Sequence, residues 1–219
     1  IPVHHTNEIA QTEALTGKPF ANFWLHNNHL KVNGTKISKS LGNIFTLEDI
    51  EKHDFDLQAF KLMALSKHYR TEGNFTWEIL QAAQNLLRKW QAVADLRWQT
   101  KDVPEKNDYT QYHADLLEAL QDDLNTPKAL MVIDKITEFE NIPETEVDSF
   151  NEVLKQIRDL LGINLLKEDI TSEQKELIQA REAAREAGDW PKSDELRDEL
   201  KAQGITVKDT PNGSIWSRL

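Results

Sequence analysis

The longest helical pattern in the chain covers residues 77–98, WEILQAAQNLLRKWQAVADLRW. Its apolar residues recur every three or four positions, which is typical of an α-helix with one buried face. Because further helical patterns lie on both sides of this segment, the sequence favours a mostly α-helical fold. We expect the buried face to carry the following side chains: Leu80, Leu87, Trp90, Ala94 and Leu96.

The shorter helical patterns have recognisable ends. Thr46 and Asp56 are of the residue types that cap helix N-termini, and the Gly-Lys-Pro sequence at 17–19 ends the first pattern. Gly162 is a typical C-cap residue, whereas residues 101–107 contain helix breakers and indicate a linker. The predicted helices cover residues 5–16, 47–52, 57–68, 109–120, 126–139, 148–161, 175–187 and 192–203.

Three segments carry signals for β-structure. Residues 20–25 are rich in aromatic side chains and are predicted to form a strand. Asn33-Gly34 is the strongest two-residue turn signal and predicts a hairpin, and a small second hairpin is expected at the C-terminal end. The strands of these hairpins are predicted over residues 29–32, 35–37, 205–207 and 214–216.

Length and composition exclude several classes of protein. The chain has 219 residues and a mean hydropathy of −0.61, which fits one large or two small globular domains. No apolar run approaches the roughly 18 residues of a membrane span, so we expect no membrane partner. The chain contains no cysteine, which excludes a disulfide scaffold, a thiolate nucleophile and a sulfur-ligated metal site built from this chain alone.

Charge is divided unevenly along the chain. The formal net charge is −11, but residues 1–101 hold 12 Lys and Arg against 10 Asp and Glu. Residues 102–219 hold 14 against 27 and therefore carry the negative charge. An acidic total weakens nonspecific phosphate binding without excluding a local basic site, so the division indicates two regions with different roles.

The first candidate site is His4-His5-Thr6-Asn7-Glu8. His4 and Glu8 are four residues apart, so on a helix they share one face and can reach one metal ion. The alternative is an N-terminal helix with ordinary polar side chains, because two ligands do not complete a zinc site. His5 is expected to point elsewhere, as a structural residue or a polar contact to substrate.

The second candidate site is the loop that spans residues 36–43, KISKSLGN. Lys36 and Lys39 lie beside hydroxyl groups and a glycine, which suits a loop that stabilises charge on a triphosphate. The alternative is solvated surface, and the glycine spacing of a Walker A loop is absent. Asp122 and Asp123 form a third candidate as metal ligands or acid–base groups, but we favour electrostatic stabilisation of the helix that starts at Thr126.

The fourth candidate site is the C-terminal tail. Arg and Asp side chains can read the edges of unpaired bases, and Trp can stack on them. The alternative is a charged helical hairpin with its own ion pairs and a Trp core, and residue chemistry leaves both interpretations open. The side chains concerned are Arg181, Arg185, Trp190, Asp194, Arg197, Asp209 and Trp216.

Several segments, taken in order, resemble the C-terminal half of a bacterial cysteinyl-tRNA synthetase, a class I aminoacyl-tRNA synthetase. HHTNEIAQTEALTGKPF, NFWLHNNHLKVNG and KISKSLGN resemble its catalytic core, with KISKS as a variant of the KMSKS loop. QDDLNTPKAL resembles the start of its DALR-type anticodon-binding domain. The stretch from AREAAREAGDW to NGSIW resembles its extreme C-terminus, so the resemblance covers nearly the whole chain.

The resemblance implies a division into four parts. Residues 1–45 would be the C-terminal edge of a Rossmann-type catalytic domain with its KMSKS-type loop, and residues 46–104 a helical region that contacts the tRNA stem. Residues 105–167 would be the DALR-like helical domain. Residues 168–219 would be the anticodon-recognition helices with a terminal β-hairpin.

The resemblance also implies an activity, namely the ATP-dependent ligation of L-cysteine to its tRNA in the cytoplasm by a monomeric enzyme. Lys36, Ser38 and Lys39 would bind ATP, supplied with Mg²⁺, and both lysines would stabilise the pyrophosphate leaving group. His4 and Glu8 would be two of four ligands of a Zn²⁺ ion that binds the substrate thiolate. The residues implied in anticodon binding are Arg185, Trp190, Asp194 and Asp209.

Departures from the family pattern limit these expectations. The chain has neither the two cysteine ligands of the zinc ion nor the His-Ile-Gly-His motif, and Ile37 replaces the usual Met of the loop. Ile1-Pro2-Val3 shows no initiator Met or signal peptide, so we expect a fragment that alone neither completes the zinc site nor makes the adenylate. The alternatives are a tRNA-binding module without catalysis and a mycothiol-type cysteine ligase, which lacks the full anticodon-reading tail.

Overall fold

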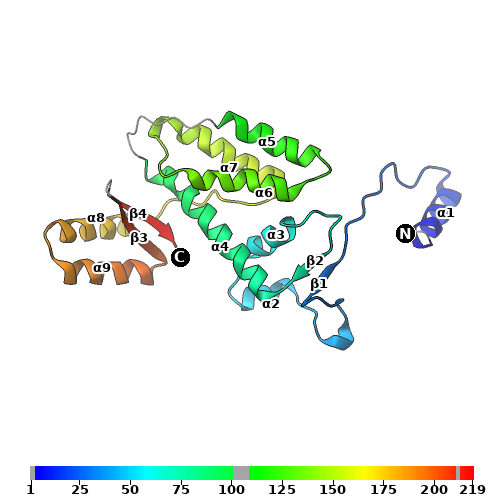
Figure 1. Cartoon of the computed structure of the whole chain (residues 1–219), viewed down its shortest axis with the longest axis horizontal. Coiled ribbons are helices and arrows are strands. Elements are labelled where there is room, and N and C mark those ends of the chain that lie inside the picture. Colours follow the sequence, from blue (N-terminus) through cyan, green and yellow to red (C-terminus); the bar gives the residue numbers. More distant parts are fainter. Residues whose placement is uncertain (1–2, 101–108, 211–212) are drawn as a thin grey trace.

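The computed structural model of the chain describes residues 3–100, 109–210 and 213–219, and the linker predicted over 101–107 lies outside these ranges. Helices dominate the described residues, as the sequence predicts (Figure 1). The α-helices are α1 (His4–Thr16), α2 (Leu47–Lys52), α3 (Leu57–Leu65), α4 (Trp77–Ala94), α5 (Thr110–Gln121), α6 (Thr126–Asp134), α7 (Val147–Leu161), α8 (Ser172–Glu186) and α9 (Trp190–Ala202). Short 3-10 turns occupy Lys39–Leu41, Asp95–Trp98, Lys135–Glu138 and Glu144–Glu146, and the strands are β1 (Leu30–Val32), β2 (Gly73–Phe75), β3 (Ile205–Thr210) and β4 (Gly213–Arg218).

The predicted helix ends are largely confirmed. The Thr46 hydroxyl accepts a hydrogen bond from the Asp49 amide in a capping box, and the Asp56 carboxylate accepts one from the Gln58 amide. Gly162 ends α7 in the left-handed conformation with φ of 67°, which glycine adopts without a steric penalty. Among the described residues, no helix is both long and apolar enough to cross a bilayer.

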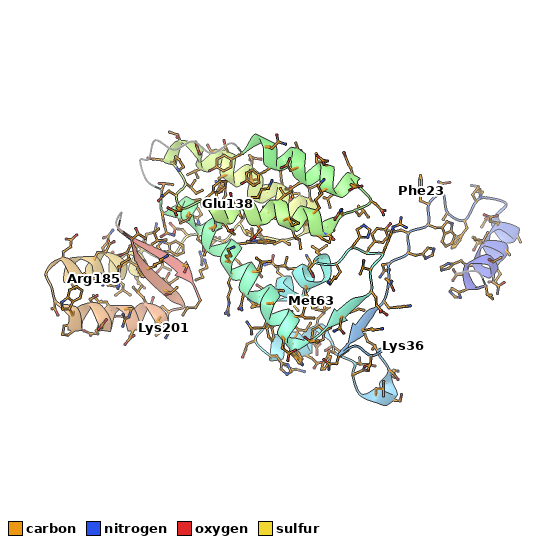
Figure 2. The ribbon with its side chains drawn as sticks, viewed as in Figure 1. Phe23, Lys36, Met63, Glu138, Arg185 and Lys201 are labelled. Carbon is orange, nitrogen blue, oxygen red and sulfur yellow. The ribbon has the colours of Figure 1, made fainter. Side chains whose placement is uncertain are left out.

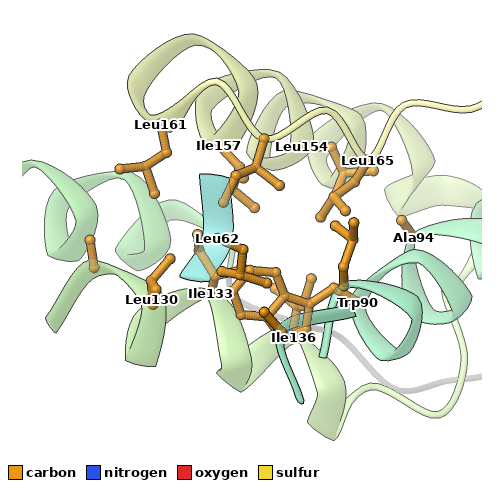
Figure 3. Close-up of a cluster of buried hydrophobic side chains, with 14 of the residues drawn as sticks. Leu62, Trp90, Ala94, Leu130, Ile133, Ile136, Leu154, Ile157, Leu161 and Leu165 are labelled. Carbon is orange, nitrogen blue, oxygen red and sulfur yellow. The ribbon is translucent and has the colours of Figure 1, made fainter. Parts of the chain in front are cut away.

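Helix α4 lies at the centre of the hydrophobic core. All five side chains predicted for its buried face are buried, and Trp90 is fully shielded from solvent. Figure 3 shows Trp90 close to Leu62 of α3 and Ile133 of α6, with Leu154 of α7 on the other side of the cluster. The Trp90 indole N–H donates to the Asp134 carboxylate over 3.0 Å, so its one polar atom is also satisfied. The helix therefore joins α3, α6 and α7 into one core.

The hairpin predicted around Asn33-Gly34 is wrong, although its turn is correct. Both residues have positive φ, and Val32 and Thr35 exchange two backbone hydrogen bonds of 2.9 and 3.0 Å. Among the described residues, no further antiparallel pair follows this single bridge. Instead, β1 pairs in parallel with β2, a pairing that is not predicted from the sequence. The reason is burial: Val32 faces Phe75 across this pair, and both side chains are buried in the core.

The strand predicted over residues 20–25 is also wrong. This segment has no ladder partner among the described residues and runs as an irregular extended connection from α1 to β1 (Figure 1). Its aromatic content favours a strand only when a neighbouring strand supplies backbone partners and a packed face. Phe23 is 92% exposed and Leu25 67% exposed, and α1 itself buries no side chain.

The C-terminal hairpin is confirmed, with β3 and β4 pairing in antiparallel register from Ile205↔Arg218 to Thr210↔Gly213. It packs with α8 and α9 around a small core that includes Trp216. Two polar contacts attach this unit to the end of α4. Arg218 pairs with the fully buried Asp95 at 3.0 Å, and the side chain of Gln99 forms two hydrogen bonds with the backbone of Trp216. Burial raises the pKa of Asp95, and the Arg218 charge opposes that shift.

Candidate functional site

The start of α1 brings together the residues of the predicted metal site. His4 Nε2 lies 3.2 Å from Glu8 Oε1, so the two side chains share one helix face as their spacing predicts. His5 does not point elsewhere, because its ring centre lies 5.4 Å from that of His4. Its ring also packs against Trp24 and His26 at centroid distances of 5.2 and 4.8 Å, which fits the structural role expected for it. One potential ligand atom from each of His4, His5 and Glu8 lies within 4.8 Å of the other two.

The chemistry of this cluster fits part of a zinc site. Imidazole and carboxylate are zinc ligands, and structural as well as catalytic zinc sites require at least three protein ligands. His5 Nδ1 is shielded from solvent and has no hydrogen-bond partner among the described residues, which leaves it available to a ligand. Partial desolvation lowers the pKa of His5, which favours the neutral form that binds metal. Sulfur ligands have to come from outside this chain, which contains no cysteine.

The loop over residues 36–43 is held by one amide side chain. Asn43 Oδ1 accepts from the Ser38 amide over 2.9 Å, and Asn43 Nδ2 donates to the Lys36 carbonyl and the Thr35 hydroxyl over 3.1 Å each. Gly42 then closes the turn with φ of 63°. These contacts fix the backbone of the loop. The hydroxyl groups of Ser38 and Ser40 form a hydrogen bond of 2.7 Å with each other.

The two lysines of this loop are exposed to solvent. In the part of the chain that the structure describes, neither the Lys36 nor the Lys39 ammonium lies within ion-pair distance of a carboxylate. Figure 2 shows Lys36 on the loop, at the opposite side of the molecule from Arg185. An anchored loop with two unpaired cations is suited to bind phosphate groups.

Asp123 does not cap the helix that starts at Thr126. Asn125 caps that helix, and its side chain accepts from the Lys128 amide over 3.1 Å. The Asp123 carboxylate instead accepts from Arg70 Nε and from the Tyr69 hydroxyl, each over 2.7 Å. The hydrogen bond from Arg70 holds the pKa of Asp123 below its ordinary value. Positive φ at Asp123 lets its side chain reach across to the segment that follows α3.

In the C-terminal tail, some of the candidate side chains are buried and others are exposed to solvent. Trp216 belongs to the small core, and Arg181 is 2% exposed, so these two are structural. Arg185 and Asp209 form an ion pair of 3.2 Å, and the Arg185 guanidinium lies 5.4 Å from the centre of the Trp190 ring. Trp190 is 58% exposed and can accept a stacked base.

Asp194 lies on the neighbouring helix α9. Its carboxylate pairs with Arg197 at 3.1 Å, and both side chains are more than half exposed. The hydrogen bond to Asp209 raises the pKa of Arg181, and the negative charge of Asp194 adds a smaller contribution. Among the four residues implied in anticodon binding, Arg185 thus contacts both Trp190 and Asp209, whereas Asp194 pairs with Arg197.

The ion pair at Asp209 predicts how this unit responds to acid. Hydrogen bonds from Arg181 lower the pKa of Asp209 from 3.8 to about 2, so folding favours the charged carboxylate. The stabilisation is present above the unfolded value and is lost as pH falls through the folded one. We expect the C-terminal unit to lose stability between about pH 4 and pH 2, measured by Trp fluorescence. An Asp209→Asn variant should lack this component, and an identical acid response in both proteins would contradict the assignment.

Two family models match the chain. The model of the class I (C) tRNA synthetase catalytic domain matches residues 1–85, and that of the cysteinyl-tRNA ligase anticodon-binding domain matches residues 167–216. Cysteine–tRNA ligases are similar over 98% of the chain: that of Finegoldia magna is 42% identical, that of Brevibacillus brevis 39% and that of Bacillus cereus strain G9842 35%. The chain spans about half the length of these curated relatives, since it covers 49–50% of each. It belongs to the cysteinyl-tRNA synthetase family.

Proposed function

We propose that this chain serves in the ATP-dependent ligation of L-cysteine to its tRNA, as part of a cysteine–tRNA ligase. Its relatives carry that name, and the matched catalytic and anticodon-binding models lie in the expected order along the chain. The proposal divides the chain into the C-terminal edge of a catalytic domain (1–45), a stem-contact region (46–104), a DALR-like domain (105–167) and an anticodon unit (168–219).

In this proposal the loop over residues 36–43 serves amino-acid activation. Cysteine attacks the α-phosphate of Mg²⁺-bound ATP, and pyrophosphate leaves with additional negative charge. Lys36 and Lys39 stabilise that charge, and Ser38 holds the nucleotide. The anchoring of the loop by Asn43 supports this role, because positioned charges act more strongly than mobile ones.

His4 and Glu8 would hold a zinc ion together with ligands from outside this chain, and His5 lies close enough to be a third ligand. A bound zinc ion supplies a soft Lewis acid that prefers the thiolate of cysteine to the hydroxyl of serine. The lowered pKa of His5 and its unpaired Nδ1 support a role at this site, as a ligand or as a group that orients the substrate.

The anticodon unit is the part of the proposal that can be tested with this chain alone. The decisive observation is that an exposed indole, Trp190, lies beside the Arg185–Asp209 pair within the segment that the anticodon-binding model matches. Trp190 would stack on an unpaired base, and Arg185, Asp194 and Asp209 would contact base edges. An aromatic platform with donors and acceptors around it is how proteins recognise single-stranded RNA bases.

The test is binding of this chain to tRNA with the cysteine anticodon and to the same tRNA with that triplet replaced, at fixed salt. Base stacking and edge contacts each contribute about 1–3 kcal/mol, so we expect the cognate tRNA to bind at least about tenfold more tightly. Trp190→Ala should weaken the binding of both tRNAs, because every base can stack on an indole. Trp98→Ala, which alters a 41% exposed indole outside the anticodon unit, is the matched control.

Each result separates the candidate functions. Equal binding of both tRNAs would leave only backbone attraction and would overturn the anticodon assignment. Absence of binding would favour the mycothiol-type ligase. The relatives contain a further half that this chain does not match. If addition of that half restores adenylate formation, a binding module without catalysis is excluded.

A further inference from the structure

Three side chains of this chain contact the carboxylate of Asp209. Arg181 Nη1 donates to Oδ1 over 2.8 Å, and Arg181 Nη2 donates to Oδ2 over 2.9 Å. The Ser214 hydroxyl donates to Oδ1 over 3.1 Å, and Arg185 Nη1 lies 3.2 Å from Oδ2. Three hydrogen bonds and one ion pair therefore surround the carboxylate, and Arg185 contributes only the ion pair. A base donor that approaches Oδ2 competes with Arg185 for that oxygen.

The two arginines differ in how readily they can leave. The Arg181 side chain is 3% exposed and makes a planar, bidentate contact, whereas the Arg185 side chain is 36% exposed and makes a single contact. Removing Asp209 from Arg181 would leave a buried guanidinium without its counterion, which is strongly unfavourable. The Arg185 guanidinium already lies 5.4 Å from the centre of the Trp190 ring, so it can leave Asp209 for solvent at little cost and keep that contact.

The contact with Arg181 also joins separate elements of the unit. Arg181 lies on α8, Asp209 on β3 and Ser214 on β4, so one guanidinium sets the position of the hairpin carboxylate relative to the helix. Glu182, the next residue on α8, anchors the same hairpin separately by accepting from the Ser214 amide over 2.8 Å. Substitution of Glu182 therefore tests the anchoring of the hairpin, whereas substitution of Arg181 also tests the orientation of the Asp209 carboxylate.

We infer that Arg181 is a positioning residue for anticodon discrimination: it holds Asp209 so that Oδ2, the oxygen shared with Arg185, accepts a base donor once Arg185 moves away. The inference rests on the proposed function and adds a residue to it. Arg181 itself contacts no RNA, because its side chain is buried between α8 and the hairpin. Recognition then includes an exchange in which a base donor takes the place of Arg185.

The experiment compares Arg181→Met, Arg181→Lys and Glu182→Ala with the unaltered chain, using tRNA with the cysteine anticodon and tRNA with that triplet replaced. Arg181→Met should reduce the ratio of the two affinities at least fivefold and leave binding of the altered tRNA within about twofold. Arg181→Lys keeps the charge but loses the bidentate contact and should give an intermediate ratio. Glu182→Ala should keep the full ratio, since Glu182 does not contact Asp209.

Circular dichroism and Trp fluorescence establish that each variant is folded, and Arg181→Lys carries the test if Arg181→Met is not. Equal affinity of the unaltered chain for both tRNAs would overturn the proposed function and this inference together. Full discrimination by the folded Arg181 variants would overturn the inference alone. Equal losses in Arg181→Met and Glu182→Ala would show that Arg181 merely anchors the hairpin, and would also overturn it.

Discussion

Replacement of Lys39 by Ala is expected to lower cysteine-dependent ATP–pyrophosphate exchange by about 10²–10³-fold in a full-length enzyme that contains this chain. The Lys39 ammonium is exposed on a loop whose backbone is held by Asn43 and Gly42. A cation held in this way stabilises the negative charge that moves onto the leaving pyrophosphate. Its loss removes an interaction that is stronger in the transition state than in the ground state, so kcat falls more than KM rises.

A nearby lysine provides the control for this prediction. Lys31 lies on β1 and pairs with Glu72 at 2.9 Å, so its charge is already engaged. Lys31→Ala should therefore change the exchange rate by less than about threefold, within the range of an exposed ion pair. The affinity for tRNA should stay nearly constant in Lys39→Ala. Unchanged pyrophosphate exchange in that variant would overturn the role given to the loop.

Replacement of Trp90 by Ala is expected to cost about 3–5 kcal/mol of unfolding free energy. Trp90 is fully buried where α4 contacts α3, α6 and α7, so its removal leaves a cavity that four helices line (Figure 3). The variant also leaves the Asp134 carboxylate without the indole donor. Urea denaturation followed by circular dichroism measures the change as a lower midpoint.

Trp190→Ala is the matched control, because it removes the same side chain from a site that is 58% exposed. Its cost in unfolding free energy should stay within about 0.5 kcal/mol, as is usual for exposed positions. The two variants should thus separate stability from RNA binding, with Trp90 controlling the first and Trp190 the second. Equal destabilisation by both substitutions would contradict the description of the core.

The helices could be predicted from the sequence because their signals are local. The caps at Thr46 and Asp56 lie within three residues of the amides that they bind, and the buried face of α4 follows its own periodicity. The pairing of β1 with β2 could not be predicted in this way. Its partners, such as Leu30 and Gly73, lie far apart in the sequence, and each strand has only three residues.

The same distinction applies to the candidate sites. The shared face of His4 and Glu8 follows from helical spacing alone, whereas the position of His5 depends on rings that a later segment supplies. The partner of Asp123 is Arg70, and a bond between residues so far apart has no local signal. Charged residues choose partners in three dimensions, so sequence patterns identify candidates for a site more readily than their contacts.

The length of helix α4 also sets the distance between the elements attached to its two ends. The turn that precedes the loop over residues 36–43 is tied to β2, because the Phe75 carbonyl accepts from the Asn33 amide over 3.0 Å. Helix α4 begins two residues after Phe75. Its eighteen residues span about 27 Å, and the turn that follows holds β4. Inserting four residues would lengthen the helix by about 6 Å and rotate one end by about 40° relative to the other. On the proposed function, the number of residues in α4 therefore sets the separation between the loop that binds ATP and the unit that binds the anticodon.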